Sequence, residues 1–143
     1  MTRPRALTFL MWFCAIYAIG AALGIVLVIV DLGRFVGGYS MGGMPVTRAQ
    51  WLTIAAPLVA TVSILMGLTA IALKCHRQWA GIPFMCIWPL IIIYGIGCAL
   101  VGAIPWTLGL RAVLNATFVG AIALWLLFKY KPSRAYFTGR KQC

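Results

Sequence analysis

The feature that most constrains this chain is a series of four long apolar stretches separated by short polar segments. They cover residues 7–30, 51–73, 81–103 and 112–128. Each stretch falls within the range of about 17–25 residues that a helix needs to cross the hydrocarbon core of a bilayer. The sequence therefore predicts an all-α fold, a bundle of four transmembrane helices.

The composition supports a membrane protein rather than a soluble domain. Of the 143 residues, 64% are hydrophobic and 9% are charged, which is more apolar surface than a soluble domain of this length can bury. We expect residues 1–143 to form a single membrane domain with an outer loop at 31–50 and a basic tail at 129–143. The apolar run at 7–30 is longer than the about 7–15 residues of a signal peptide, so we expect it to be retained as a helix.

The distribution of lysine and arginine predicts how the helices are oriented. Nine of the 12 lie in the N-terminus, the second loop and the tail, and three lie in the first and third loops. Because cytoplasmic segments carry the excess of positive residues, both termini are predicted to be cytoplasmic. Topology thus accounts for the net charge of +11, and no nucleic-acid partner is expected.

Small residues mark the helix faces that are expected to pack. Lipid provides no hydrophobic drive for helix association, so close approach at glycine and alanine becomes important. Three stripes follow helical spacing: Gly20 and Gly24; Gly95, Ala99 and Gly102; and Ala112, Ala116 and Gly120. We expect them to form the seam of the bundle. The alternative for Gly20 and Gly24, a G-x-x-x-G pair, is homodimerisation.

Two charges at the outer ends of the predicted helices form a candidate ion pair. Asp31, the single acid of the chain, ends the first apolar stretch, and Arg111 precedes the fourth. Charges at membrane depth are costly and are therefore candidates for function. We expect Asp31 and Arg111 to pair across the outer mouth of the bundle, with Asn115 one turn below. The alternative is two separately solvated interfacial charges.

The outer loop and the second loop are the two loops whose residue types could form a binding site. Apolar side chains at Phe35, Tyr39, Met41 and Met44 indicate that the outer loop meets a partner or dips into the interface. The second loop holds the single histidine within Lys74-Cys75-His76-Arg77, which is too few ligands for a zinc site. No metal and no cofactor are expected.

A partial motif resembles a family of membrane enzymes. Arg111-Ala112-x-x-Asn115 is similar to part of the R-A-H-x-N-x-x-E signature of the membrane-associated eicosanoid and glutathione metabolism proteins. Position 113 is valine rather than histidine, and position 118 is phenylalanine rather than glutamate. The resemblance would imply a glutathione-using enzyme that works as a trimer.

The tail carries a second resemblance. Trp125-Leu-Leu-Phe-Lys-Tyr-Lys-Pro-Ser-Arg-Ala-Tyr-Phe resembles the ending of small four-helix bacterial inner-membrane proteins of unassigned activity. Basic residues gain about 1 kcal/mol each near anionic lipids, and aromatic residues settle at headgroup level. We therefore expect lipid anchoring by Lys129, Tyr130, Lys131, Arg134, Tyr136 and Phe137.

The function expected from these features is non-catalytic. One acid and one histidine, predicted on opposite sides of the membrane, do not make an acid–base site. We expect an accessory or structural subunit that packs against another membrane protein or against itself. The first alternative is a small oligomeric transporter or channel that uses helix kinks at Pro57 and Pro89. The second is the glutathione-using membrane enzyme.

Overall fold

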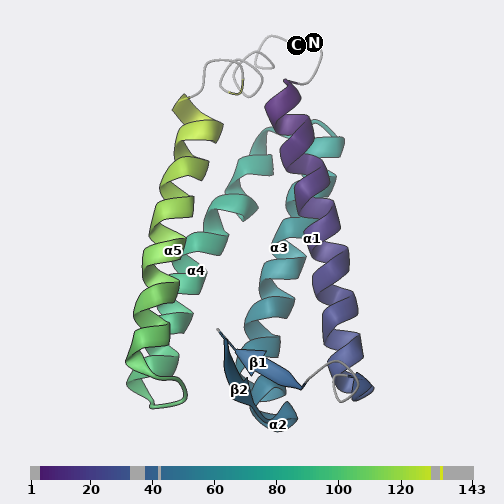
Figure 1. Cartoon of the computed structure of the whole chain (residues 1–143). Helices are drawn as coiled ribbons and strands as arrows, with labels where there is room; N and C mark the ends of the chain where they lie inside the picture. Colours follow the sequence, from purple (N-terminus) through teal and green to yellow (C-terminus); the bar gives the residue numbers. More distant parts are fainter. Residues whose placement is uncertain (1–3, 33–37, 42, 130–132, 134–143) are drawn as a thin grey trace.

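The computed structural model describes residues 4–32, 38–41, 43–129 and 133 of the chain. In these residues, four helices are long and apolar enough to cross a membrane: Arg5–Ile29, Arg48–Lys74, Gly81–Leu100 and Trp106–Lys129 (Figure 1). The prediction of four membrane-spanning helices is therefore confirmed. The molecule is mostly helical, although two short strands depart from the all-α expectation.

The second span is built from three consecutive helical segments. It begins with α2 (Arg48–Gln50), continues as a π-helical turn, η2 (Trp51–Ala55), and then becomes α3 (Ala56–Lys74). A capping box starts it: Gln50 N–H donates to Thr47 Oγ1 at 3.2 Å, and Thr47 N–H donates to Gln50 Oε1 at 2.9 Å. These reciprocal bonds place the start of the helix three residues before the predicted boundary.

The fourth span starts earlier than the sequence suggested. Helix α5 (Trp106–Leu124) begins directly after Pro105 and continues into a π-helical turn, η4 (Trp125–Lys129). A proline is favourable at this place because the first helical turn leaves backbone N–H groups unpaired in any case. Arg111 consequently lies inside the helix, five residues after its start, and not before it as predicted.

Helix α4 (Gly81–Leu100) ends three residues earlier than predicted, in a Schellman turn. The N–H of Gly102 donates to Ala99 O at 3.1 Å, and that of Ala103 donates to Cys98 O at 2.9 Å. Gly102 has a φ of 71°, a left-handed conformation that glycine adopts without steric cost. This glycine terminates a helix instead of lying on the packing face expected for it.

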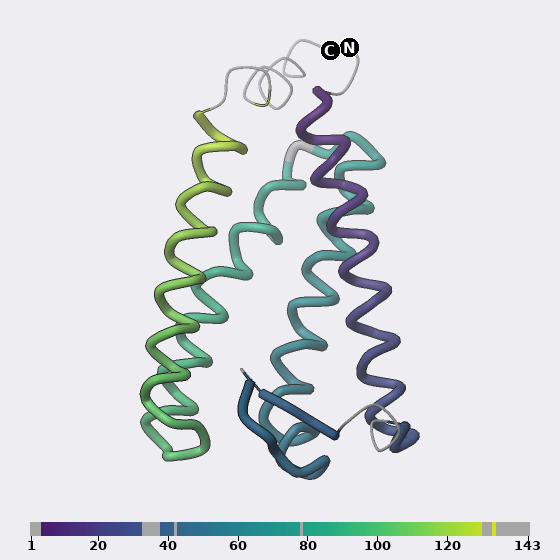
Figure 2. The backbone as a smooth tube through the Cα atoms, viewed as in Figure 1, coloured from purple at the N-terminus to yellow at the C-terminus, as the bar shows by residue number. Residues whose placement is uncertain are grey.

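The helices pack in sequence order. The close pairings are α1 (Arg5–Ile29) with α3, α3 with α4, and α4 with α5, whereas α1 and α3 do not pack closely on α5 in the described residues. Figure 2 shows why: α4 is tilted, lying towards α1 and α3 at its start and beside α5 at its end. At the end of the molecule where α4 terminates, side chains of α3, α4 and α5 line a pocket.

A buried apolar cluster lies at the opposite end, where α4 begins. Its largest fully buried side chains come from all four spans and are Leu7, Leu73, Ile87 and Leu127. Helix α3 also donates a hydrogen bond to α1, from Ser63 Oγ to Ala18 O at 2.9 Å. The face of α1 that packs is thus the one carrying Leu7, Leu10, Cys14 and Ala18.

The outer loop contains a small β-hairpin. Strands β1 (Tyr39–Met41) and β2 (Met44–Val46) are antiparallel, with Met41 opposite Met44. The sequence between them is Gly-Gly, and Gly43 has a φ of 88°, the positive value that tight hairpin turns require. The hairpin lies at the end of the bundle opposite to the start of α1 and the end of η4, which share one end (Figure 2).

Candidate functional site at the hairpin end

The space between α3 and α5 is a pocket of 340 Å³. Helix α4 forms its back wall, and Met41 of β1 lies at the hairpin end. Its volume is within the range of about 300–1,000 Å³ that is typical of small-molecule sites. The walls are mainly aliphatic, and the lining residues with polar side chains are Tyr94, Cys98, Arg111 and Asn115.

A hydrogen bond between two of the spans forms part of the pocket wall. Tyr94 of α4 donates its hydroxyl to the carbonyl of Ile54 at 2.6 Å. Ile54 belongs to the π-helical turn, in which the N–H of Ala56 reaches back to Trp51 O. This widened turn precedes Pro57, which has no N–H to donate to the ladder. The predicted irregularity at Pro57 thus adjoins the pocket.

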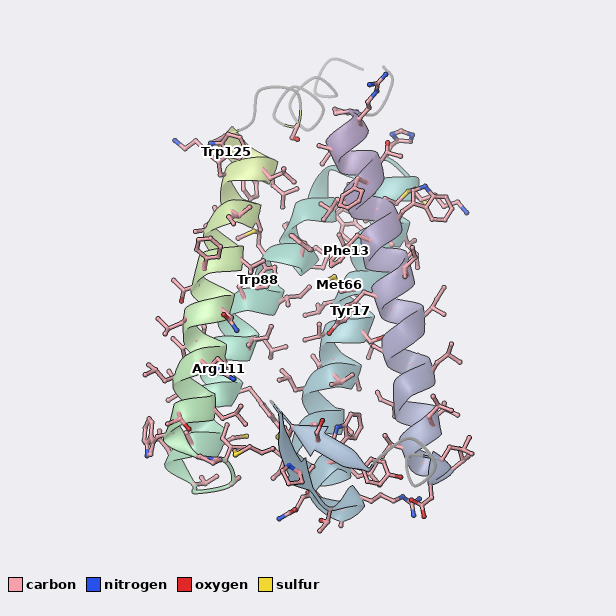
Figure 3. All side chains as sticks on the ribbon, viewed as in Figure 1. Phe13, Tyr17, Met66, Trp88, Arg111 and Trp125 are labelled. Atoms are coloured by element: carbon pink, nitrogen blue, oxygen red, sulfur yellow. The ribbon has the colours of Figure 1, made fainter. Side chains whose placement is uncertain are left out.

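Arg111 lies at the rim of the pocket. Its position five residues into α5 corresponds to about 7 Å along the helix axis. The side chain leaves α5 on the side of α4 and the hairpin (Figure 3). It also lines a second cavity of 160 Å³ with Met44, Thr107 and Leu108. The two cavities share Leu108 and Arg111. Arg111 therefore lies where the smaller cavity, which we call the rim, meets the larger and mainly aliphatic pocket.

The structure does not bring Asp31 and Arg111 together. The Asp31 carboxylate instead accepts a hydrogen bond from the Tyr39 hydroxyl at 2.7 Å and lies 3.9 Å from Arg48 Nε. The expected ion pair is thus corrected: the partner arginine comes from the same loop. Arg48 follows the hairpin directly and is therefore returned to the end of α1, whereas Arg111 is on the far side of the pocket.

Arg48 also completes the end of α1. Its Nε donates to Val28 O at 2.9 Å, and a terminal guanidinium nitrogen donates to Ile29 O. The last carbonyls of a helix have no partner within it, and a cation there interacts favourably with the helix dipole. Sequence reasoning assigned no role to Arg48, although the short distance in sequence to Asp31 could have indicated one.

Small residues bring α4 and α5 into close contact. Gly95, Ala99 and Ala116 are buried, and a Cβ placed on Gly95 would lie 3.4 Å from the Cβ of Ala112. A closer approach than at Gly95 involves Gly109, which sequence reasoning missed because it assigned this position to a loop. A Cβ there would lie 3.0 Å from Ala99 Cβ and 3.2 Å from Gly95 O.

Towards the start of α4, the side chain of Trp88 lies between α4 and α5. A Cβ on Gly120 would lie 3.0 Å from Cγ of Trp88, which is labelled on α4 in Figure 3. The Trp88 indole also packs edge-on against Phe84, with ring centroids 5.7 Å apart. Gly120 therefore accommodates a large ring instead of a second helix backbone.

Gly20 and Gly24 are placed differently from the other predicted packing residues. A Cβ on either one would meet nothing within 4 Å, because α1 packs on α3 with another face. The stripe expected to join the seam of the bundle lies outside it. Gly20 is exposed, whereas Gly24 is half-buried and lines a cavity of 340 Å³ together with Tyr39 and Trp51.

The remaining expected contact residues are only partly described. Met41 and Met44 face each other across the hairpin, Tyr39 binds Asp31, and Lys129 ends η4. Phe35, Tyr130, Lys131, Arg134, Tyr136 and Phe137 lie outside the described residues. In the described part of the chain, no three His, Cys, Asp or Glu side chains are grouped as metal ligands.

The four spans define the class of this protein, a multi-pass integral membrane protein. Comparisons with known proteins add no family to that class: no family model, curated protein or solved structure matches the chain. The two resemblances noted in the sequence therefore remain short local similarities.

Proposed function

We propose that this protein is a non-catalytic accessory subunit of a bacterial inner membrane. It would pack against another membrane protein, or against a second copy of itself, through the open face of α1. The observation that supports this most directly is that α1 has one close helix partner, α3, while a Cβ added to either glycine of its G-x-x-x-G pair would meet no neighbouring segment within 4 Å.

The other helical glycines make this contrast informative. Gly67, Gly81, Gly95, Gly109 and Gly120 each lie close enough to a neighbouring helix for an added Cβ to touch it. Among the described helical glycines, Gly20, Gly24 and Gly97 have nothing within that range. Because small residues promote helix association in lipid, two of them four residues apart on a face without an internal partner favour an external one.

Substitution of the open glycines tests this proposal. The tagged protein would be recovered from native membranes in mild detergent, and its mass and co-purifying proteins would be compared between variants. We expect Gly20→Leu and Gly24→Leu to abolish the assembly without unfolding the chain, because an added Cβ at either position meets nothing within 4 Å and the cavity beside Gly24 has room for the rest of the side chain. Gly97→Leu, on α4, is the matched control and should leave the assembly unchanged.

Two outcomes would contradict the proposal. A monomer in wild-type membranes would remove the accessory role, and an assembly that survives both substitutions would remove α1 as its contact. A homo-oligomer that transports ions in vesicles would favour the alternative of a transporter, for which the widened turn before Pro57 is the supporting observation. A trimer that binds glutathione would favour the enzyme, whose partial motif residues Arg111, Ala112 and Asn115 line the pocket.

We also propose that both termini face the cytoplasm, as the excess of lysine and arginine indicates. Cys75 lies exposed in the turn after α3, at the same end as the start of α1. A membrane-impermeant maleimide should therefore label Cys75 in inverted vesicles and not in intact spheroplasts. Labelling in spheroplasts alone would reverse the orientation. The same orientation would place the basic tail against the anionic cytoplasmic leaflet.

A further inference from the structure

The pocket at the hairpin end has features that the accessory function does not use. It extends from Arg111 on the fourth span to Val59 on the second and Ile91 on the third, and the rim cavity that contains Thr107 adjoins it at Arg111. Ile91 lies nine residues before the end of α4, or about 14 Å along its axis. The pocket therefore runs from the end of the bundle towards the middle of the membrane.

The charge at the rim has no counter-charge among the residues that the structure describes. Asp31 is the single Asp or Glu of the sequence, and its carboxylate lies with Tyr39 and Arg48. Arg111 makes no ion pair in the described residues. The N-terminal end of α5, with Thr107 in its first turn, adds the positive end of a helix dipole to the same rim. The rim is thus complementary to an anion.

The interior of the pocket requires a different chemistry. Leu58, Val59, Ile91 and Leu108 offer only dispersion contacts, and they come from α3, α4 and α5, so an aliphatic wall surrounds the interior on several sides. A ligand that satisfies both parts must carry an anionic group at one end and an aliphatic chain at the other. Its anionic end must lie nearer the membrane surface than its chain.

We propose that this pocket binds one anionic phospholipid of the surrounding membrane, with its phosphate on Arg111 and one acyl chain between α3 and α5. A phospholipid already has this orientation in a leaflet, with its headgroup at the surface and its chains directed inward. Thr107 lies in the rim cavity beside Arg111 and is within the region that the headgroup would occupy. The proposal concerns a different face from that of α1 and does not depend on the accessory function.

A cysteine inside the pocket provides the test. Cys98 lines the pocket, whereas Cys86, on the same helix, is exposed outside it. The full-length protein in a neutral detergent would be treated with N-ethylmaleimide, and the labelling rates of both thiols would be followed by peptide mass spectrometry. Phosphatidylglycerol and phosphatidylcholine would be added separately as mixed micelles, and native mass spectrometry would count the lipids that remain bound.

We expect phosphatidylglycerol to slow labelling of Cys98 and to leave Cys86 unaffected. One arginine near an anionic lipid corresponds to a preference of about fivefold over the zwitterionic lipid, so half-protection should need about fivefold less phosphatidylglycerol. Arg111→Gln should remove this preference, and Arg77→Gln, at the other end of the bundle, should keep it. Native mass spectrometry of the wild-type protein should show one retained phosphatidylglycerol.

Several results would overturn the assignment. Equal protection by both lipids, unchanged in Arg111→Gln, would mean that the pocket accepts any acyl chain and that the charge has no part. Protection by inorganic phosphate or glutathione at comparable concentration would identify a site for a free anion instead of a membrane lipid. Labelling of Cys98 that no lipid alters, with no lipid retained in the wild-type protein, would show that the pocket is not a lipid site.

Discussion

Replacement of Gly109 by leucine should force α4 and α5 apart. The first added carbon would already lie 3.0 Å from Ala99 Cβ and 3.2 Å from the carbonyl oxygen of Gly95. Both neighbours belong to α4, and neither can rotate away, since one is a backbone atom and the other is a Cβ. The remaining three carbons of the leucine have no space unless the two helix axes separate.

The expected cost follows from two opposing effects. Overpacking costs about 1–3 kcal/mol, and the upper end applies here because the contact is with backbone and Cβ atoms. The exchange of glycine for leucine within a helix returns roughly 0.8–1 kcal/mol. The net destabilisation is about 2 kcal/mol, which reduces the ratio of folded to unfolded protein about 30-fold.

Reversible unfolding in mixed micelles would measure this difference. The protein in a mild detergent would be titrated with sodium dodecyl sulfate and followed by tryptophan fluorescence. Gly97→Leu is the matched control, because Gly97 lies on the same pair of helices with nothing within 4 Å. Equal unfolding midpoints for Gly109→Leu and Gly97→Leu would refute the close contact between α4 and α5.

Three further predictions use the same titration. Arg48→Ala should destabilise the protein by about 1–2 kcal/mol, because the end of α1 loses its charged donor; a shift no larger than that of Arg77→Ala would contradict this. Ser63→Ala should cost about 0.6 kcal/mol, the average for a hydrogen bond between membrane helices, and Thr61→Ala, whose bond stays within its own helix, controls for the loss of a hydroxyl. His76→Gly should stabilise by about 1 kcal/mol, since His76 has a φ of 55° and left-handed residues other than glycine are strained; an unchanged midpoint would show that this strain is absent.

The sequence was sufficient to locate the four spans, because hydrocarbon thickness sets their length directly. The sequence was less reliable in placing the ends of the spans, because capping residues, prolines and glycines determine where each helix begins and ends. Arg111 was taken as a boundary because of its charge, yet Pro105 was the better signal, and a long arginine side chain can reach the rim from inside a helix. The capping box at Thr47 and Gln50 and the Gly-Gly sequence that joins the two strands could also have been recognised in the sequence. The expectation of a loop without regular structure led to both being overlooked.

The candidate site depended on geometry that no local pattern contains. The pocket exists because α4 is tilted between α3 and α5, and this tilt results from close contact at Gly109 and a bulky filler at Trp88. Small residues indicate that helices can approach but not which helix they approach. The stripe at Gly20 and Gly24 looked equivalent to that at Gly95 and Ala99, and the two are used differently. The partner of Asp31 likewise depended on how the hairpin folds back.

The bond between Tyr94 and Ile54 has a consequence for biosynthesis. Its two partners are 40 residues apart in the chain, so at about 5–20 residues per second Ile54 is synthesised roughly 2–8 s before its hydroxyl donor. During that interval the Ile54 carbonyl in the widened turn lacks the Tyr94 hydroxyl as a donor. Insertion of the second span should therefore be delayed or incomplete until the third span arrives. A ribosome stalled between the two spans would trap an intermediate that the insertion machinery still holds.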